Sequence, residues 1–149
     1  MNVRLSRFIV LASLVAALSG CRGDKKKPDG PEISGVTITG KLLQNGKPFK
    51  ILPDETIKVV FMSAEGEGKV AGGADVKEDG TFEIIGPSGK GLPAGNYKVS
   101  LNSEIYGGSG TDRFAEKFEM TYTPFLATVG AGGPQNFELD LGTRKVVKK

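Results

Sequence analysis

Apolar and polar residues alternate with a period of two in four runs between residues 36 and 141 of this 149-residue sequence. The apolar members of these runs are Val36, Ile38, Leu42, Ile57, Val59, Phe61, Tyr97, Val99, Leu101, Phe137, Leu139 and Leu141. A period of two places alternate side chains on one face of a β-strand, whereas an amphipathic helix needs an apolar repeat of about 3.6 residues. Turn-forming residues separate the runs. The pattern predicts an all-β domain over residues 33–142, a sandwich or a barrel of seven or eight strands without helices.

The turn at Asp79-Gly80 predicts one hairpin in register. Four neighbouring residues are expected to face the core: Ala74, Val76, Phe82 and Ile84. A three-residue loop, Glu78–Gly80, would pair Val76 with Phe82 and keep all four on one face. Such a loop ends in a left-handed residue, so Gly80 is expected at positive φ.

The second face of the 57–62 run is also partly apolar, because Val60 and Met62 alternate with the core-facing residues. A contiguous apolar patch on that face would be typical of a contact surface. The alternative is that another strand or loop covers the face.

Residues 1–20 have the three parts of a secretory signal peptide. Arg4 and Arg7 form a positive start, residues 8–18 are apolar except for Ser13, and Ser19-Gly20 supplies small residues before a cleavage point. The apolar stretch is shorter than the approximately 20 residues that a membrane-spanning helix needs. We therefore expect this segment to be removed after export.

The tetrapeptide Leu18-Ser19-Gly20-Cys21 resembles the lipobox of bacterial lipoproteins. The resemblance implies that signal peptidase recognises Leu18, Ser19 and Gly20, and that Cys21 is acylated and becomes the mature N-terminus. Two or more acyl chains hold a protein firmly on a membrane, so a covalent lipid is the only cofactor expected. The alternative is an ordinary signal peptide followed by an unrelated cysteine, although Cys21 is the only cysteine and has no disulfide partner.

The charges predict a tether and a tail around the domain. Residues 21–32 contain the lipidated cysteine and then only charged residues, Gly and Pro, which predicts a disordered tether. Residues 143–149 are basic and predicted to be a disordered tail. Residues 33–142 contain ten Lys and Arg against fourteen Asp and Glu, so no nucleic-acid-binding face is indicated. The residue after Cys21 is Arg22. In enteric bacteria an Asp at this position resembles an inner-membrane retention signal, so Arg22 slightly favours the outer over the cytoplasmic membrane.

Several turn motifs occur in the order found in the carboxypeptidase regulatory-like domain, a transthyretin-like β-sandwich. The segments are Gly40–Leu42, Asn45–Pro48, Asp79–Phe82, Leu92–Val99 and Phe137–Leu141. The chain resembles this family, and in particular the small lipoproteins of planctomycetes that carry the domain. The resemblance implies that the domain is an antiparallel transthyretin-like or Ig-like β-sandwich of seven or eight strands. Because the motifs make turns and strands, the resemblance brings no catalytic residues with it.

The sequence offers little for catalysis. It contains no histidine, which removes the commonest general base and metal ligand, and its one cysteine is assigned to lipid. The hydrolase relative of the transthyretin-like fold depends on histidines. We therefore expect a non-catalytic protein without a metal, anchored to a membrane and contacting an unknown envelope protein or polymer.

One long loop is the best candidate for binding. Residues 104–117 include Tyr106, Arg113 and Phe114 beside a glycine-rich stretch, and long loops on a rigid scaffold often carry binding residues. The alternative function is therefore a glycan- or peptide-binding module that uses this loop. The absence of tryptophan makes glycan binding less favoured. The other alternative is that this loop binds no ligand.

Overall fold

The computed structural model describes residues 35–65, 68–86, 89–106, 113–114 and 116–149, and this part of the chain contains nine strands and no helix. The prediction of an all-β domain is confirmed, with at least one strand more than expected. The strands are β1 (Ile38–Gln44), β2 (Lys47–Pro48), β3 (Glu55–Ser63), β4 (Val70–Asp75), β5 (Thr81–Ile84), β6 (Gly95–Ile105), β7 (Leu126–Val129), β8 (Gln135–Asp140) and β9 (Lys145–Lys148).

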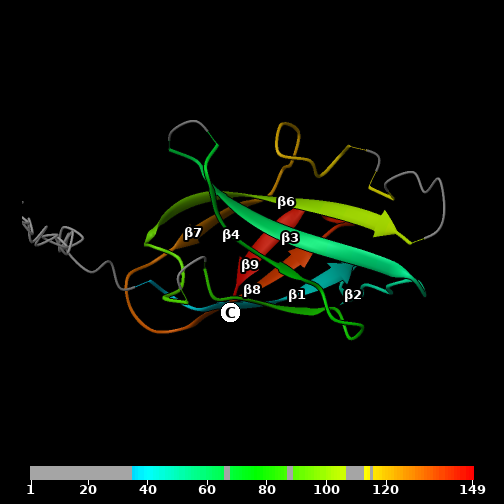
Figure 1. Ribbon diagram of the computed structural model, residues 1–149, viewed down its shortest axis with the longest axis horizontal. Coiled ribbons are helices and arrows are strands. Elements are labelled where there is room, and N and C mark those ends of the chain that lie inside the picture. The colour runs from blue at the N-terminus through cyan, green and yellow to red at the C-terminus, as the bar shows by residue number, and fades with distance from the viewer. Residues whose placement is uncertain (1–34, 66–67, 87–88, 107–112, 115) are drawn as a thin grey trace, which may run out of the picture. The chain divides into compact units, whose positions relative to one another are not determined.

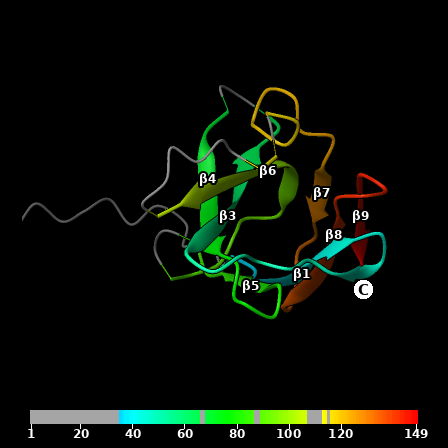
Figure 2. The same ribbon diagram turned by 90° about the vertical axis from the view of Figure 1, so that its right-hand side faces the viewer.

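The strands form two facing sheets, as a β-sandwich requires (Figures 1 and 2). One sheet has the order β4-β3-β6-β7. The other has the order β2-β1-β8-β9, and β5 pairs with β1 beside β2. The described residues from Gly35 onward belong to one compact unit.

One strand pair departs from the predicted antiparallel arrangement. β1 and β8 pair in parallel from Ile38 opposite Gln135 to Leu43 opposite Asp140. Every other strand pair is antiparallel within the described residues. A parallel pair needs a long crossover connection, and here that connection is most of the domain. The alternating pattern of each strand could not distinguish the two directions.

The residues of the four predicted runs face inward and build the core. All twelve of them are buried, and none is more than 8% exposed. Phe82 and Ile84 of β5 and Leu92 before β6 complete this layer. Burial of apolar surface stabilises the domain by roughly 25 cal/mol per Å², so this interior is the main contribution to its stability.

The three-residue loop Glu78–Gly80 closes as predicted, with the Lys77 N–H donating to the Thr81 carbonyl at 2.7 Å, but no strand ladder continues from it. Gly80 has a φ of 80°, and its N–H donates to the carbonyl of Lys77 at 2.8 Å. The pairing between Val76 and Phe82 is wrong, because β4 pairs with β3 while β5 pairs with β1 in the opposite sheet. The turn is therefore a corner between sheets. Val76 and Phe82 would face the core in a hairpin, and they also face it at this corner. The two arrangements therefore give the same sequence pattern.

The predicted disordered tail is wrong for its last residues. Lys145–Lys148 form β9, which pairs with β8 from Asp140 opposite Lys145 to Phe137 opposite Lys148. Val146 packs against the core, and the Lys149 Nζ lies 3.1 Å from a Glu138 carboxylate oxygen. The charges that suggested a solvated tail are those of an edge strand, where lysines discourage pairing with other chains.

The outer side of the β3–β6 sheet is covered over Met62, which is 1% exposed. Met62 lines a shallow hollow together with Lys98 and Met120, while Val60 is half-buried. Of the two alternatives for this face, an exposed contact surface or a covered one, Met62 fits the covered face.

Residues after Phe114 close one side of the sandwich. β7 pairs with β6 only at Gly95–Lys98, and further along β6 the carbonyl of Phe118 accepts a 2.9 Å hydrogen bond from Leu101. The carbonyl of Phe125 accepts one from Val99 at 3.0 Å. This connection therefore continues the sheet edge where β7 ends.

Candidate functional site

Four phenylalanines form an aromatic cluster between the two sheets: Phe49, Phe114, Phe118 and Phe125. Successive ring centroids lie 5.9, 5.8 and 5.1 Å apart along this series. Such spacings are those of favourable aromatic pairs. Phe49 follows the β1–β2 hairpin and the other three belong to the β6–β7 connection, so the cluster ties this connection to the five-stranded sheet.

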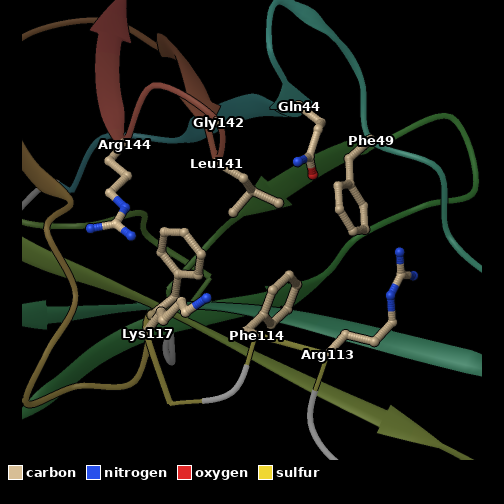
Figure 3. Close-up of a pocket in the computed structure, with 9 residues that line it drawn as sticks. Gln44, Phe49, Arg113, Phe114, Lys117, Leu141, Gly142 and Arg144 are labelled. Atoms are coloured by element: carbon tan, nitrogen blue, oxygen red, sulfur yellow. The ribbon is translucent and has the colours of Figure 1, made fainter.

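A cavity of about 290 Å³ opens over the aromatic cluster. Its described lining residues are Gln44, Phe49, Arg113, Phe114, Lys117, Phe118, Leu141, Gly142 and Arg144. Figure 3 shows these side chains converging from the β1–β2 hairpin, the β8–β9 turn and the β6–β7 connection. Three of these residues are cations and none is acidic. The arrangement can hold a small ligand with an apolar part and a negative charge.

Arg113 lies at one side of this cavity and is held by a buried carboxylate. Its guanidinium donates to Glu55, whose side chain is fully buried. Glu55 also accepts hydrogen bonds from the Ser103 hydroxyl at 2.7 Å and the Leu52 N–H at 2.9 Å. The guanidinium carbon lies 4.8 Å from the centre of the Phe49 ring, within cation–π range. The main role of Arg113 is therefore structural: it pairs with Glu55, which neutralises its charge.

The other two candidate binding residues have different environments. Phe114 is 4% exposed and belongs to the core, although one side of it lines the cavity. Tyr106 is 83% exposed, follows the end of β6, and is not among the residues described around the cavity. The structure brings Arg113 and Phe114 together and leaves Tyr106 outside; residues 107–112 of the same loop lie outside the described residues.

Asp140 holds together the two turns at the rim of the cavity. Its Oδ1 accepts hydrogen bonds from the N–H groups of Asn45, Gly142 and Thr143 at 2.9, 2.9 and 3.3 Å. Its Oδ2 accepts one from Gly46 at 2.8 Å. Partial burial raises the pKa of this carboxyl, but the four backbone N–H groups outweigh it, and the pKa lies below its usual value.

Replacing Asp140 by asparagine is expected to destabilise the domain by about 1–2 kcal/mol, because an amide offers one acceptor oxygen for four N–H donors. A carboxyl whose pKa is lowered by folding stabilises the native state above its unfolded pKa, about 3.9. That contribution is lost as pH falls through the lower folded pKa. Denaturant unfolding of the wild type and Asp140→Asn should thus differ at pH 7 and converge in strong acid; a gap independent of pH would contradict this role.

Of the residues that line this cavity, only Arg113 and Phe114 are predictable from the sequence pattern. Gln44 ends β1, Phe49 follows β2, and Arg144 lies in the β8–β9 turn, all far along the chain from the β6–β7 connection. Arg144 also lies in the segment 143–149, whose basic composition predicts a disordered tail. Lys117 was inside the predicted loop but was not singled out. The pairing of β1 with β8 and the Asp140 hydrogen bonds bring the two turns together, and neither is visible in the local sequence.

The other predicted site residues lie at the start of the chain. Leu18, Ser19, Gly20 and Cys21 are outside the described residues. In the ranges that the structure describes, no three His, Cys, Asp or Glu residues are grouped so that they could hold a metal ion. The same ranges contain no helix long and apolar enough to cross a membrane.

Fold and site together define a β-sandwich with a small cavity that three cations line where the β6–β7 connection meets the β1–β2 and β8–β9 turns. Comparisons with protein-family models, with curated proteins and with solved structures returned no match.

Proposed function

We propose that this protein is a membrane-anchored envelope lipoprotein whose β-sandwich acts as a non-catalytic interaction or structural module. The observation that carries the proposal is the placement of Cys21 directly after Leu18-Ser19-Gly20 at the end of an apolar export signal. Acylation accounts for a single cysteine that no disulfide can use.

The described domain agrees with such a module. It is a two-sheet sandwich with turns at Asn45-Gly46 and at Gly80, as expected of a carboxypeptidase regulatory-like, transthyretin-like domain. Its rigid sheets would present loops and turns to a partner. The partner is an envelope protein or polymer rather than a nucleic acid, and Arg22 after the cysteine favours the outer membrane.

The anchor is tested by replacing Cys21 with alanine in the full chain. The wild type is expected to incorporate labelled palmitate and to sediment with membranes, whereas Cys21→Ala should incorporate none and keep its signal segment. The matched control is Ser13→Ala, which changes the apolar segment without touching the acylated residue. Equal labelling of wild type and Cys21→Ala would overturn the lipoprotein assignment.

The interaction is tested by crosslinking the intact lipoprotein in cells and identifying the products by mass spectrometry. One partner recovered with the wild type and lost with Cys21→Ala would support an anchored interaction module. Diffuse crosslinking to abundant envelope proteins would contradict a specific partner.

The cavity favours a second candidate function, a ligand-binding module that uses part of the 104–117 loop. Arg113, Phe114 and Lys117 of this loop line the cavity. Unlike the predicted loop site, this one includes residues from two other turns and excludes Tyr106.

A further inference from the structure

We propose that the cavity over the aromatic cluster binds a carboxylate attached to an apolar body such as a phenyl ring. This inference rests on the second candidate function, ligand binding at the cavity, and names the class of ligand. It does not depend on the membrane anchor.

The floor of the cavity is apolar and largely buried. Phe49, Phe114 and Phe118 are 4–6% exposed, and Leu141 is 8% exposed, yet all four line the cavity. Figure 3 shows the rings of Phe49 and Phe114 between the polar side chains. An apolar group placed on this floor would bury mainly its own surface, because the floor residues have little exposed area of their own.

The rim carries two cations, Lys117 and Arg144, that no described residue neutralises. Lys117 and Arg144 are exposed, and neither has an ion-pair partner among the described residues. Arg113, in contrast, is paired with Glu55. Two cations beside an apolar floor, with no acidic residue among the described lining, match an anion and disfavour a cation.

The backbone on one side of the rim, beside Gln44 and Arg144, is fixed by hydrogen bonds before any ligand binds. Asp140 bonds the backbone of the Asn45-Gly46 turn and of Gly142-Thr143, and these turns flank Gln44 and Arg144. Arg144 itself has a φ of 54°, a conformation set by the β8–β9 turn. A rim held in this way loses less conformational freedom on binding, which preserves affinity.

The size of the cavity limits the ligand. A volume of about 290 Å³ is at the lower end of the range of small-molecule sites, roughly 300–1,000 Å³. This volume suits one ring with a short carboxylate arm and is small for an oligosaccharide. Such a group occurs in a free aryl-alkyl acid and at the C-terminus of a peptide that ends in an aromatic residue.

The test compares 3-phenylpropionate with its uncharged amide, 3-phenylpropanamide. The ¹⁵N-labelled full-length chain, purified in a nonionic detergent, is titrated with each probe and followed by NMR. We expect the acid to shift the amide signals of Phe49, Phe118 and Gly142, and to bind at least tenfold more tightly than the amide. The amide has the same ring and therefore controls for partition into detergent.

Charge-removing variants locate the binding. Lys117→Gln and Arg144→Gln are each expected to weaken binding of the acid about three- to tenfold, with little effect on the amide probe. Lys58→Gln is the matched control, because Lys58 is an exposed lysine of β3 that does not line this cavity. Acid and amide binding equally, or binding insensitive to both rim variants, would overturn the proposal.

A second pair of probes distinguishes the two sources of the carboxylate. Acetyl-Ala-Phe with a free C-terminus is compared with 3-phenylpropionate and with acetyl-Ala-Phe-amide. Tighter binding of the free peptide than of the small acid assigns the site to peptide C-termini, and the reverse order assigns it to free organic acids. Failure of every probe at the cavity would overturn this inference and leave the lipid anchor, tested at Cys21, unaffected.

Discussion

Replacing Phe125 by alanine is expected to lower the free energy of unfolding by about 3–5 kcal/mol. Phe125 is completely buried, and its ring stacks on Phe118 at 5.1 Å with an interplanar angle of 18°. Its removal would leave a cavity where the β6–β7 connection meets the core. The carbonyl of the same residue bonds Val99 of β6, so loss of the side chain also loosens the sheet edge.

The measurement is denaturant unfolding of the full chain, and Leu126→Ala is the matched control. Leu126 is the next residue along the chain but is 66% exposed, so its truncation should cost no more than about 0.5 kcal/mol. Similar losses for both variants would mean that the aromatic cluster is not packed as described.

Replacing Arg113 by alanine is expected to destabilise the domain by about 2–3 kcal/mol. The change removes the cation from Glu55 and leaves a buried carboxylate with two neutral donors, Ser103 and Leu52. Breaking a buried pair costs roughly 3–5 kcal/mol, and the smaller value reflects the 30% exposure of the Arg113 side chain. Lys117→Ala, an exposed cation of the same connection, should change stability little.

The ion pair itself is isolated by a double-mutant cycle. Glu55→Gln removes the charge but keeps an oxygen that can accept from Ser103 or Leu52. Arg113→Ala should therefore cost much less in the Glu55→Gln background than in the wild type. Additive losses would show that Arg113 contributes through packing on Phe49 rather than through the buried charge.

The strands and the core were predictable because each strand has a strict alternation. Ile57, Val59 and Phe61 mark β3 by their spacing alone, and the turn chemistry at Asp79-Gly80 fixed the φ of Gly80. Partnership between strands was not predictable. Val76 and Phe82 face the same core from opposite sheets, so a corner and a hairpin leave identical patterns in the sequence.

The site was less predictable than the fold for a related reason. Arg113 and Phe114 are predictable as candidates because they are a cation and an aromatic residue in a long loop. Their local sequence does not indicate that Glu55 neutralises Arg113 or that the core buries Phe114. The basic residues around Arg144 predict a solvated tail. Its place beside the cavity depends on β9 and on the Asp140 hydrogen bonds, which join segments from opposite ends of the domain.

The parallel pair of β1 and β8 has a consequence for when the domain can fold. β1 is the first strand of the domain, and its inner neighbour is one of the last two. During synthesis, the β1 edge that pairs with β8 therefore stays unpaired until almost the whole domain has been made. Contacts so distant in sequence slow folding, because a long loop must close before they form. The chain thus stays open, and vulnerable to aggregation or proteolysis, until its C-terminal residues arrive.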